Sequence, residues 1–87
     1  MKVRIPTPLR SYTGGASAVE ATGDTVDALL HDLDARHPGL RFRMVDEQDR
    51  LRPHMRVFVD GELTRDLDVA LDGVTEVTLM QALSGGT

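Results

Sequence analysis

The sequence contains no cysteine, which excludes disulfide bonds, thiolate metal ligands and a cysteine nucleophile. If this chain takes part in sulfur chemistry, the sulfur must be carried by something other than a side chain. Aromatic residues are also scarce: there is no tryptophan, one tyrosine and two phenylalanines, and the formal net charge is −4. Because nucleic-acid binding relies on basic surfaces and aromatic stacking, we expect no nucleic-acid partner.

Long apolar runs are missing as well. No stretch approaches the ~18 consecutive apolar residues of a transmembrane helix, so we expect no membrane partner. The first residues, Met1 to Pro6, lack the apolar centre of a signal peptide, which makes the cytoplasm the expected compartment.

Catalytic and metal-binding motifs are not recognisable either. His31 and His37 are six residues apart, which places them on different faces of a helix, and His54 has no ligand partner at a suitable spacing. We interpret the histidines as surface or structural residues. No serine, threonine or carboxylate stands in a nucleophile motif, and no glycine-rich loop with a Walker lysine is present to hold a nucleotide. We therefore expect no catalytic residue, metal site or cofactor in the chain itself.

The C-terminus is distinctive. Eighty-seven residues with 40% apolar and 28% charged side chains suit one small globular domain, which we expect over residues 1–83. Residues 84–87, Ser-Gly-Gly-Thr, form an expected flexible tail, because adjacent glycines lose much backbone entropy on ordering. Such a tail is either a frayed end or a narrow tip that can thread into the cleft of an enzyme.

The N-terminal half predicts a hairpin followed by a helix. Val3, Ile5 and Leu9 alternate with basic residues, so a strand is expected over 2–10, with its end unpaired or bulged at Pro6 and Pro8. A glycine turn over 11–15 leads to a second strand over 16–22.

The apolar period then changes from two to between three and four. A helix face is predicted by residues at three- and four-residue spacing: Val26, Leu29, Leu30, Leu33, His37 and Leu40. Asp24 or Thr25 is the expected N-cap, and Pro38-Gly39 the expected end. A short second helix over 40–44 is expected to place Leu40, Met44 and, as a further candidate, Phe42 at the edge of the core.

The C-terminal half predicts three strands. They are expected over 55–59, 62–63 and 75–81, with a long loop over 46–53, Asp60-Gly61 as a type I′ turn, and Leu67 and Leu71 against the core. The fold class is therefore α+β, a β-grasp with a mixed sheet of four to five strands and one main helix across one face. The first and last strands are expected to pair in parallel at the centre.

Strand parity also predicts an interaction surface. Phe58 and Met80 have the parity opposite to the inward valines and leucines of their strands, so we expect them to form an exposed apolar patch continuous with Leu83. In the alternative, the long loop covers Phe58. The arginines between Arg41 and Arg56 are either a solvated surface or a patch that steers a partner.

Several short segments lie in one order along nearly the whole chain: Ile5-Pro6-Thr7, Leu9-Arg10, Thr13-Gly14-Gly15, Gly23-Asp24-Thr25, Val57 to Glu62, Leu67, Asp72-Gly73 and Leu83-Ser84-Gly85-Gly86. In their order and spacing, and with the terminal Gly-Gly, these segments resemble the ubiquitin-like sulfur carriers of the ThiS and MoaD family. The N-terminal segments are most similar to the actinobacterial carriers of cysteine biosynthesis. Three positions depart from the family pattern: Val74, Gln81 (often proline) and Thr87, which follows the second glycine.

The resemblance implies a protein co-substrate rather than an enzyme. An E1-like adenylyltransferase and sulfurtransferase would use ATP to adenylate the terminal glycine, and sulfur would then convert it to a thiocarboxylate. A sulfur-accepting synthase, cysteine-synthase-like or specific to another pathway, would receive that sulfur. Gly86 would carry it after a JAMM-type protease removes Thr87, with Gly85 required for steric reasons. The partner-binding residues would be Phe58, Met80, Leu83 and Ser84.

Two other functions stay open at this point. The chain resembles the small subunit of molybdopterin synthase in the same way, with its tail held permanently by a partner. It also fits a ubiquitin-like module that binds or is conjugated without sulfur transfer.

Overall fold

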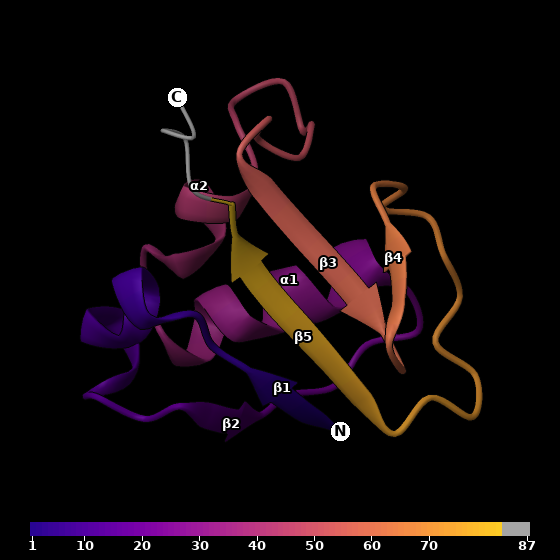
Figure 1. The fold of residues 1–87 in the computed structure, drawn as a ribbon, viewed down its shortest axis with the longest axis horizontal. Coiled ribbons are helices and arrows are strands. Elements are labelled where there is room, and N and C mark those ends of the chain that lie inside the picture. Colours follow the sequence, from indigo (N-terminus) through magenta and orange to yellow (C-terminus); the bar gives the residue numbers. More distant parts are fainter. Residues whose placement is uncertain (83–87) are drawn as a thin grey trace.

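The computed structural model describes residues 1–82 and contains one mixed sheet with a helix across one face (Figure 1). The five strands lie in the order β2-β1-β5-β3-β4, so the predicted β-grasp is confirmed. The elements are β1 (Lys2–Arg4), the 3-10 helix η1 (Thr7–Thr13), β2 (Ala18–Glu20), α1 (Val26–Arg36), α2 (Leu40–Met44), β3 (Met55–Val59), β4 (Glu62–Thr64) and β5 (Glu76–Gln81).

Strand β5 lies at the centre of the sheet. It pairs in parallel with β1, where Val3 faces Val77, and antiparallel with β3, where Val57 faces Leu79. The first and last strands are therefore adjacent, as predicted, and the β1–β2 and β3–β4 hairpins flank them. β5, the last strand in the sequence, therefore joins the two halves of the sheet.

The N-terminal strand is much shorter than its alternating pattern predicted. It ends at Arg4, and residues 7–13 form a 3-10 helix with Pro8 in its first turn. Proline has no N–H and a fixed φ, which suit the start of a helix better than a strand interior. Leu9 is buried from this helix instead, and β2 is limited to residues 18–20 rather than 16–22. The predicted glycine turn is confirmed, because Gly14 and Gly15 have φ angles of 64° and 90°.

Helix α1 begins and ends close to the predicted residues. The Thr25 hydroxyl is the N-cap and accepts a hydrogen bond of 3.1 Å from the N–H of Ala28. Four of the six residues predicted for its inner face are buried in this helix: Val26, Leu29, Leu30 and Leu33. Leu40 is buried from α2 instead, and the prediction is wrong for His37, which is only partly buried because it lies at the C-cap, where the helix ends.

In helix α2, the prediction is wrong for one residue, Phe42. Leu40 and Met44 are buried as predicted, but the Phe42 side chain is 57% exposed and does not cover the core. Residues two apart in an α-helix differ by about 200° around the axis, so Phe42 faces away from Leu40.

The β3–β4 hairpin confirms the predicted type I′ turn. Asp60 and Gly61 have φ angles of 47° and 86°, and both central residues of that turn require positive values. Leu71 is buried and Leu67 is partly buried against the core, as expected. No helix formed by residues 1–82 is long and apolar enough to cross a membrane.

Candidate partner-binding site

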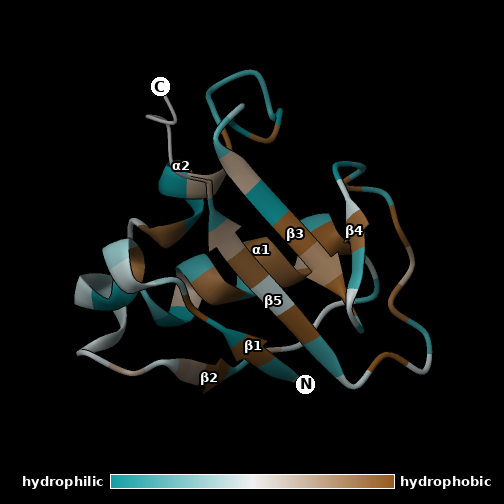
Figure 2. Cartoon of the chain, in the orientation of Figure 1, coloured by the Kyte–Doolittle hydropathy of each residue, from teal (hydrophilic) through white to brown (hydrophobic). Residues whose placement is uncertain are grey.

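The two faces of the sheet differ sharply along β3 and β5. Val57, Val77 and Leu79 point toward α1 and are at most 2% exposed. Phe58 and Met80 have the opposite parity, and the register pairs Phe58 with Thr78 and Arg56 with Met80. Phe58 and Met80 are therefore diagonal neighbours on the outer face, close enough for large side chains to interact. Hydrophobic segments dominate both strands in Figure 2.

Three residues form what we call the outer apolar patch: Phe58, Leu63 and Met80. Leu63 lies on β4 directly opposite Phe58 and is 53% exposed, while Met80 is 44% exposed. Phe58 between them is half-buried, so it is neither fully exposed nor covered. Leu83, the predicted continuation of the patch, lies outside the described residues. Exposed apolar side chains gathered on one face of a small domain are typical of an interaction surface.

The other half of the outer face is charged and internally paired. The Glu76 carboxylate lies 2.8 Å from Arg4 Nε and 4.0 Å from Lys2 Nζ. The N-terminal amine contacts the Glu20 carboxylate at 3.0 Å. Opposite charges thus neutralise one another around β1, so the apolar half of the face is the better candidate for binding a protein.

The start of β5 is held by one carboxylate. Asp60 Oδ1 accepts hydrogen bonds from the Thr75 hydroxyl and the Glu76 N–H, both at 2.9 Å. The backbone N–H of Glu76, followed by the Thr75 side chain, lowers the pKa of Asp60 below its ordinary value of 3.8. Hydrogen bonds to the charged form of a carboxylate have this effect. Asp60 therefore fixes the turn and the beginning of the central strand together.

The end of β5 is held by backbone pairing. Gln81 is the last residue of the strand and faces Met55, and the N–H of Ala82 donates to the His54 carbonyl at 2.7 Å. Proline is common at this position in the family that the sequence resembles, but here the β3–β5 pairing continues through Gln81. The base of the C-terminal segment is therefore fixed on the sheet as far as Ala82.

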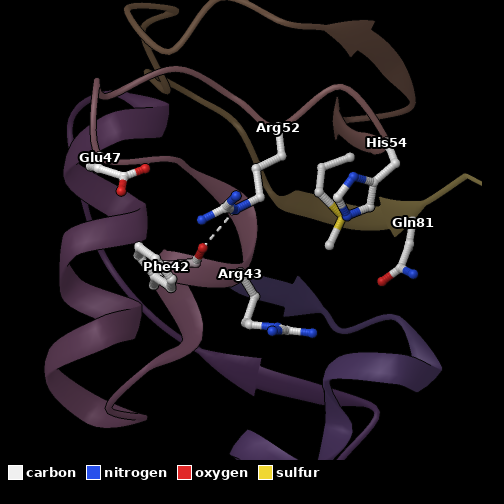
Figure 3. A pocket seen from close by; sticks show the side chains of 7 residues that line it. Phe42, Arg43, Glu47, Arg52, His54 and Gln81 are labelled. Carbon is white, nitrogen blue, oxygen red and sulfur yellow. Dashed lines mark hydrogen bonds between the residues drawn. The ribbon is translucent and has the colours of Figure 1, made fainter.

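A cleft adjoins this base, and we call it the tail-base cleft. Arg52 is the central cation: its guanidinium carbon lies 4.7 Å from the centre of the Phe42 ring, and its Nε donates to the Phe42 carbonyl at 2.8 Å. The cleft is shown in Figure 3 and is lined by Phe42, Arg43, Glu47, Arg52, His54, Met55 and Gln81.

The other arginines of the basic stretch have different environments. Arg41 is largely buried and lies 3.2 Å from both the Asp27 and the Asp49 carboxylates, so it is neither a solvated charge nor available to a partner. Arg56 donates to the Pro53 and Met55 carbonyls. The stretch therefore does not act as one patch; its arginines divide into paired and unpaired groups.

The described residues offer no metal centre: within 1–82, no three His, Asp or Glu side chains gather in a suitable arrangement. His31 lies 3.6 Å from Asp27 on the exposed face of α1, and His37 caps the C-terminus of that helix. The remaining predicted site residues, Ser84, Gly85, Gly86 and Thr87, lie outside the described residues.

Sequence reasoning missed two exposed apolar residues. Leu63 could have been found, because a two-residue turn at Asp60-Gly61 forces Leu63 opposite Phe58 on the outer face. The exposure of Phe42 follows from the helical geometry of 40–44, but its contact with Arg52 joins a helix to a loop and has no signal in the sequence.

Known proteins match this fold and nearly the whole chain. The family model described as "ThiS family" matches residues 3–86. The sulfur carrier protein CysO of Mycobacterium tuberculosis (strain H37Rv) is 36% identical over 97% of this chain and 96% of the relative.

Solved structures show the same similarity in three dimensions. A carrier in the crystal structure of the Amycolatopsis orientalis BexX/CysO complex superposes with a TM-score of 0.88 at 38% identity, covering 98% of both chains. SAMP1 of Haloferax volcanii, a small archaeal modifier protein, superposes with a TM-score of 0.78 at 29% identity, over 99% of this chain and 98% of that one.

Proposed function

This chain belongs to the ThiS family and is a sulfur carrier, and we propose that Gly86 is the residue that carries the sulfur, as a thiocarboxylate. The observation that supports this most strongly is the extent of the family match, which ends at Gly86 and so includes both glycines. The carrier is a co-substrate that partner enzymes act on, rather than an enzyme.

The proposed reaction has two steps on the partner. A carboxylate oxygen of Gly86 attacks the α-phosphate of ATP, and pyrophosphate leaves. Sulfide then attacks the acyl carbon of the adenylate, AMP leaves, and the thiocarboxylate remains on Gly86. If the partner supplies the sulfur as a persulfide, the attack displaces AMP and forms an acyl disulfide with the partner; a thiol then cleaves its S–S bond, which releases the thiocarboxylate and leaves the two thiols joined as a disulfide. ATP belongs to the adenylyltransferase and sulfurtransferase, and we place the reaction in the cytoplasm.

The carrier contributes position rather than reactive side chains. Glycine at 85 and 86 leaves no Cβ atoms, so the backbone can approach a nucleotide closely. Ala82 is fixed to His54 on the sheet, which sets the point from which the tail leaves the domain. Binding of the domain by the partner then makes the attack on ATP effectively unimolecular.

The outer apolar patch is the proposed docking face for the adenylating partner, together with Leu83 and Ser84. A homologous carrier has been crystallised in complex with a second protein, BexX, so binding of a carrier of this fold by another protein has a precedent. The charge-paired half of the outer face, around Glu76, is proposed to stay outside the contact.

The sulfur acceptor is proposed to be a synthase of cysteine or of another sulfur-containing metabolite. The similarity to CysO favours the cysteine-synthase-like acceptor over the small-subunit role in molybdopterin synthase. A second function has separate support, because SAMP1 is a modifier and superposes over nearly the whole chain. The same activated Gly86 would then form an amide with a protein amine instead of accepting sulfur.

We further propose that the chain with Thr87 after Gly86 is a precursor. Its Gly86 carbonyl is in a peptide bond to Thr87, and an amide cannot act as the carboxylate nucleophile toward ATP. Threonine at the reacting position would also bring a stiff β-branched side chain into a cleft suited to glycine. A protease of the zinc-dependent JAMM type, cleaving after Gly86, would release the active form.

Intact-mass measurement tests both proposals. The full-length chain and a form ending at Gly86 are each incubated with the adenylyltransferase, ATP and sulfide, without protease. We expect only the shortened form to gain the mass difference between sulfur and oxygen. Equal gain by both forms would contradict the precursor, and no gain by either would contradict the carrier role at Gly86.

A further inference from the structure

We infer that the tail-base cleft is a docking site for an acidic segment of the enzyme that activates the tail, with Arg43 and Arg52 as the recognising cations. This inference rests on the proposed function, because it concerns the partner that holds residues 83–86. It names a second contact region, separate from the outer apolar patch.

The first argument is the distribution of charge. The chain is acidic overall, with a net charge of −4, and three of its arginines (Arg4, Arg36 and Arg41) lie within 4.0 Å of carboxylates. Within residues 1–82, neither Arg43 nor Arg52 has a carboxylate within 4.0 Å, although Glu47 also lines the cleft and the charge of Arg52 acts on the nearby Asp46 carboxylate. Cations that an acidic domain leaves unpaired in one hollow form a surface complementary to acidic groups.

The second argument is the orientation of Arg52. Its Nε donates to the Phe42 carbonyl, and its guanidinium carbon lies over the Phe42 ring, 4.7 Å from the ring centre (Figure 3). Within the described part of the chain, its two terminal nitrogens donate no hydrogen bond. A guanidinium held in this way presents a planar pair of donors, which matches a carboxylate and loses little further entropy on binding.

The third argument is position. The cleft is lined by Gln81 and His54, and the His54 carbonyl accepts the hydrogen bond of Ala82, the last described residue. An enzyme that holds the segment following Ala82 must therefore place its own surface next to the cleft. Arg56, cross-strand from Met80, extends the cationic rim toward the outer apolar patch, so that one partner can cover both regions.

The test compares binding of carrier variants to the adenylyltransferase. The form ending at Gly86, which leaves the described domain intact, is titrated into the enzyme at low and high salt, and the variants are Arg43→Gln, Arg52→Gln and their combination. We expect a Kd increase of about fivefold for each single change at low salt, with the difference shrinking at high salt, as for partly exposed ion pairs. The KM for the carrier in adenylation should rise in parallel while kcat and the KM for ATP stay unchanged.

Arg50→Gln is the matched control. Arg50 is an exposed arginine of the same loop, but it lines a different hollow, beside Leu51 and Arg65. We expect it to change Kd by less than about twofold. Because Arg52→Gln also removes a hydrogen bond, Arg52→Lys is included, which keeps the charge and should recover part of the affinity and salt dependence.

Each outcome bears on one claim. An unchanged Kd in the double variant, or an equal loss in Arg50→Gln, would overturn the docking site. A rise in the KM for ATP alone would assign the cleft to nucleotide phosphate instead. If the parent chain binds but is never adenylated, the proposed function fails, while the Kd comparison still decides whether the cleft docks the enzyme.

Discussion

The two ends of β5 have very different surroundings. At its start, Asp60 binds the backbone of Thr75 and Glu76, and the Glu76 side chain is neutralised by Arg4 and Lys2. At its end, Ala82 is held by a backbone hydrogen bond to His54, beside an exposed Met80 and two arginines, Arg43 and Arg52, that have no carboxylate within 4.0 Å among residues 1–82. One end satisfies its polar groups internally, which stabilises the fold, and the other leaves charged and apolar groups available to a partner.

The core beneath both ends should be the most sensitive region. Leu33 is fully buried in the same cluster as Val57 and Leu79. Leu33→Ala removes buried methyl groups and leaves a cavity, so we expect the free energy of unfolding to fall by about 2–5 kcal/mol. Thermal or urea unfolding measures this loss, and an unmoved melting temperature would show that the assigned face of α1 is wrong.

The sharpest functional change is expected beyond the end of the strand. Gly85→Val adds a β-branched side chain next to the proposed reacting residue and should lower adenylation by roughly 100-fold by displacing Gly86 from ATP. Because Gly85 belongs to the tail over 84–87 that the sequence predicts to be flexible, the melting temperature should be unchanged. Pyrophosphate exchange with the form ending at Gly86 measures the effect. The adenylation rate of Gly85→Ala should lie between those of the parent form and Gly85→Val. Normal activity of the valine variant would disprove the steric requirement.

The outer apolar patch should give a smaller effect on the same reaction. Phe58→Ala removes half-buried apolar surface at the centre of the patch, so we expect the KM for the carrier to rise by about fivefold to thirtyfold with the fold intact. Val74→Ala, close to the start of β5, is the control and should leave KM unchanged. Unaltered adenylation kinetics for Phe58→Ala would exclude the patch as the docking face.

The smallest predicted effect concerns Asp60, which holds the start of β5. The lowered pKa of Asp60 means that its contribution to stability is present above the ordinary pKa of 3.8 and is lost as the pH falls through the lowered value. Asp60→Asn should therefore lower the melting temperature modestly at neutral pH, and the difference from the parent should shrink in strong acid. Its adenylation KM should not change. A difference in melting temperature that persists unchanged at the lowest pH would contradict this role of the carboxylate.

Sequence patterns predicted the parts of this fold that repeat and failed where a contact joins distant residues. The alternation in 55–59 and 76–81 and the helical period of Val26 to Leu33 are local signals, and the structure confirms them. The same alternation misled over residues 5–10, because Leu9 can reach the core from a 3-10 helix as well as from a strand. At the candidate site, strand parity placed Phe58 and Met80 on the outer face, but the cation–π contact of Arg52 with Phe42 depends on tertiary structure alone.

The central claim is that sulfur is carried on Gly86, and the most direct test locates the sulfur atom. The form ending at Gly86 is treated with the adenylyltransferase, ATP and sulfide, and its C-terminal fragments are analysed by tandem mass spectrometry. The account predicts the mass shift in every fragment that contains residue 86 and in none that ends before it. A shift on any earlier residue, or an unmodified Gly86 in chains that have turned over ATP, would contradict it.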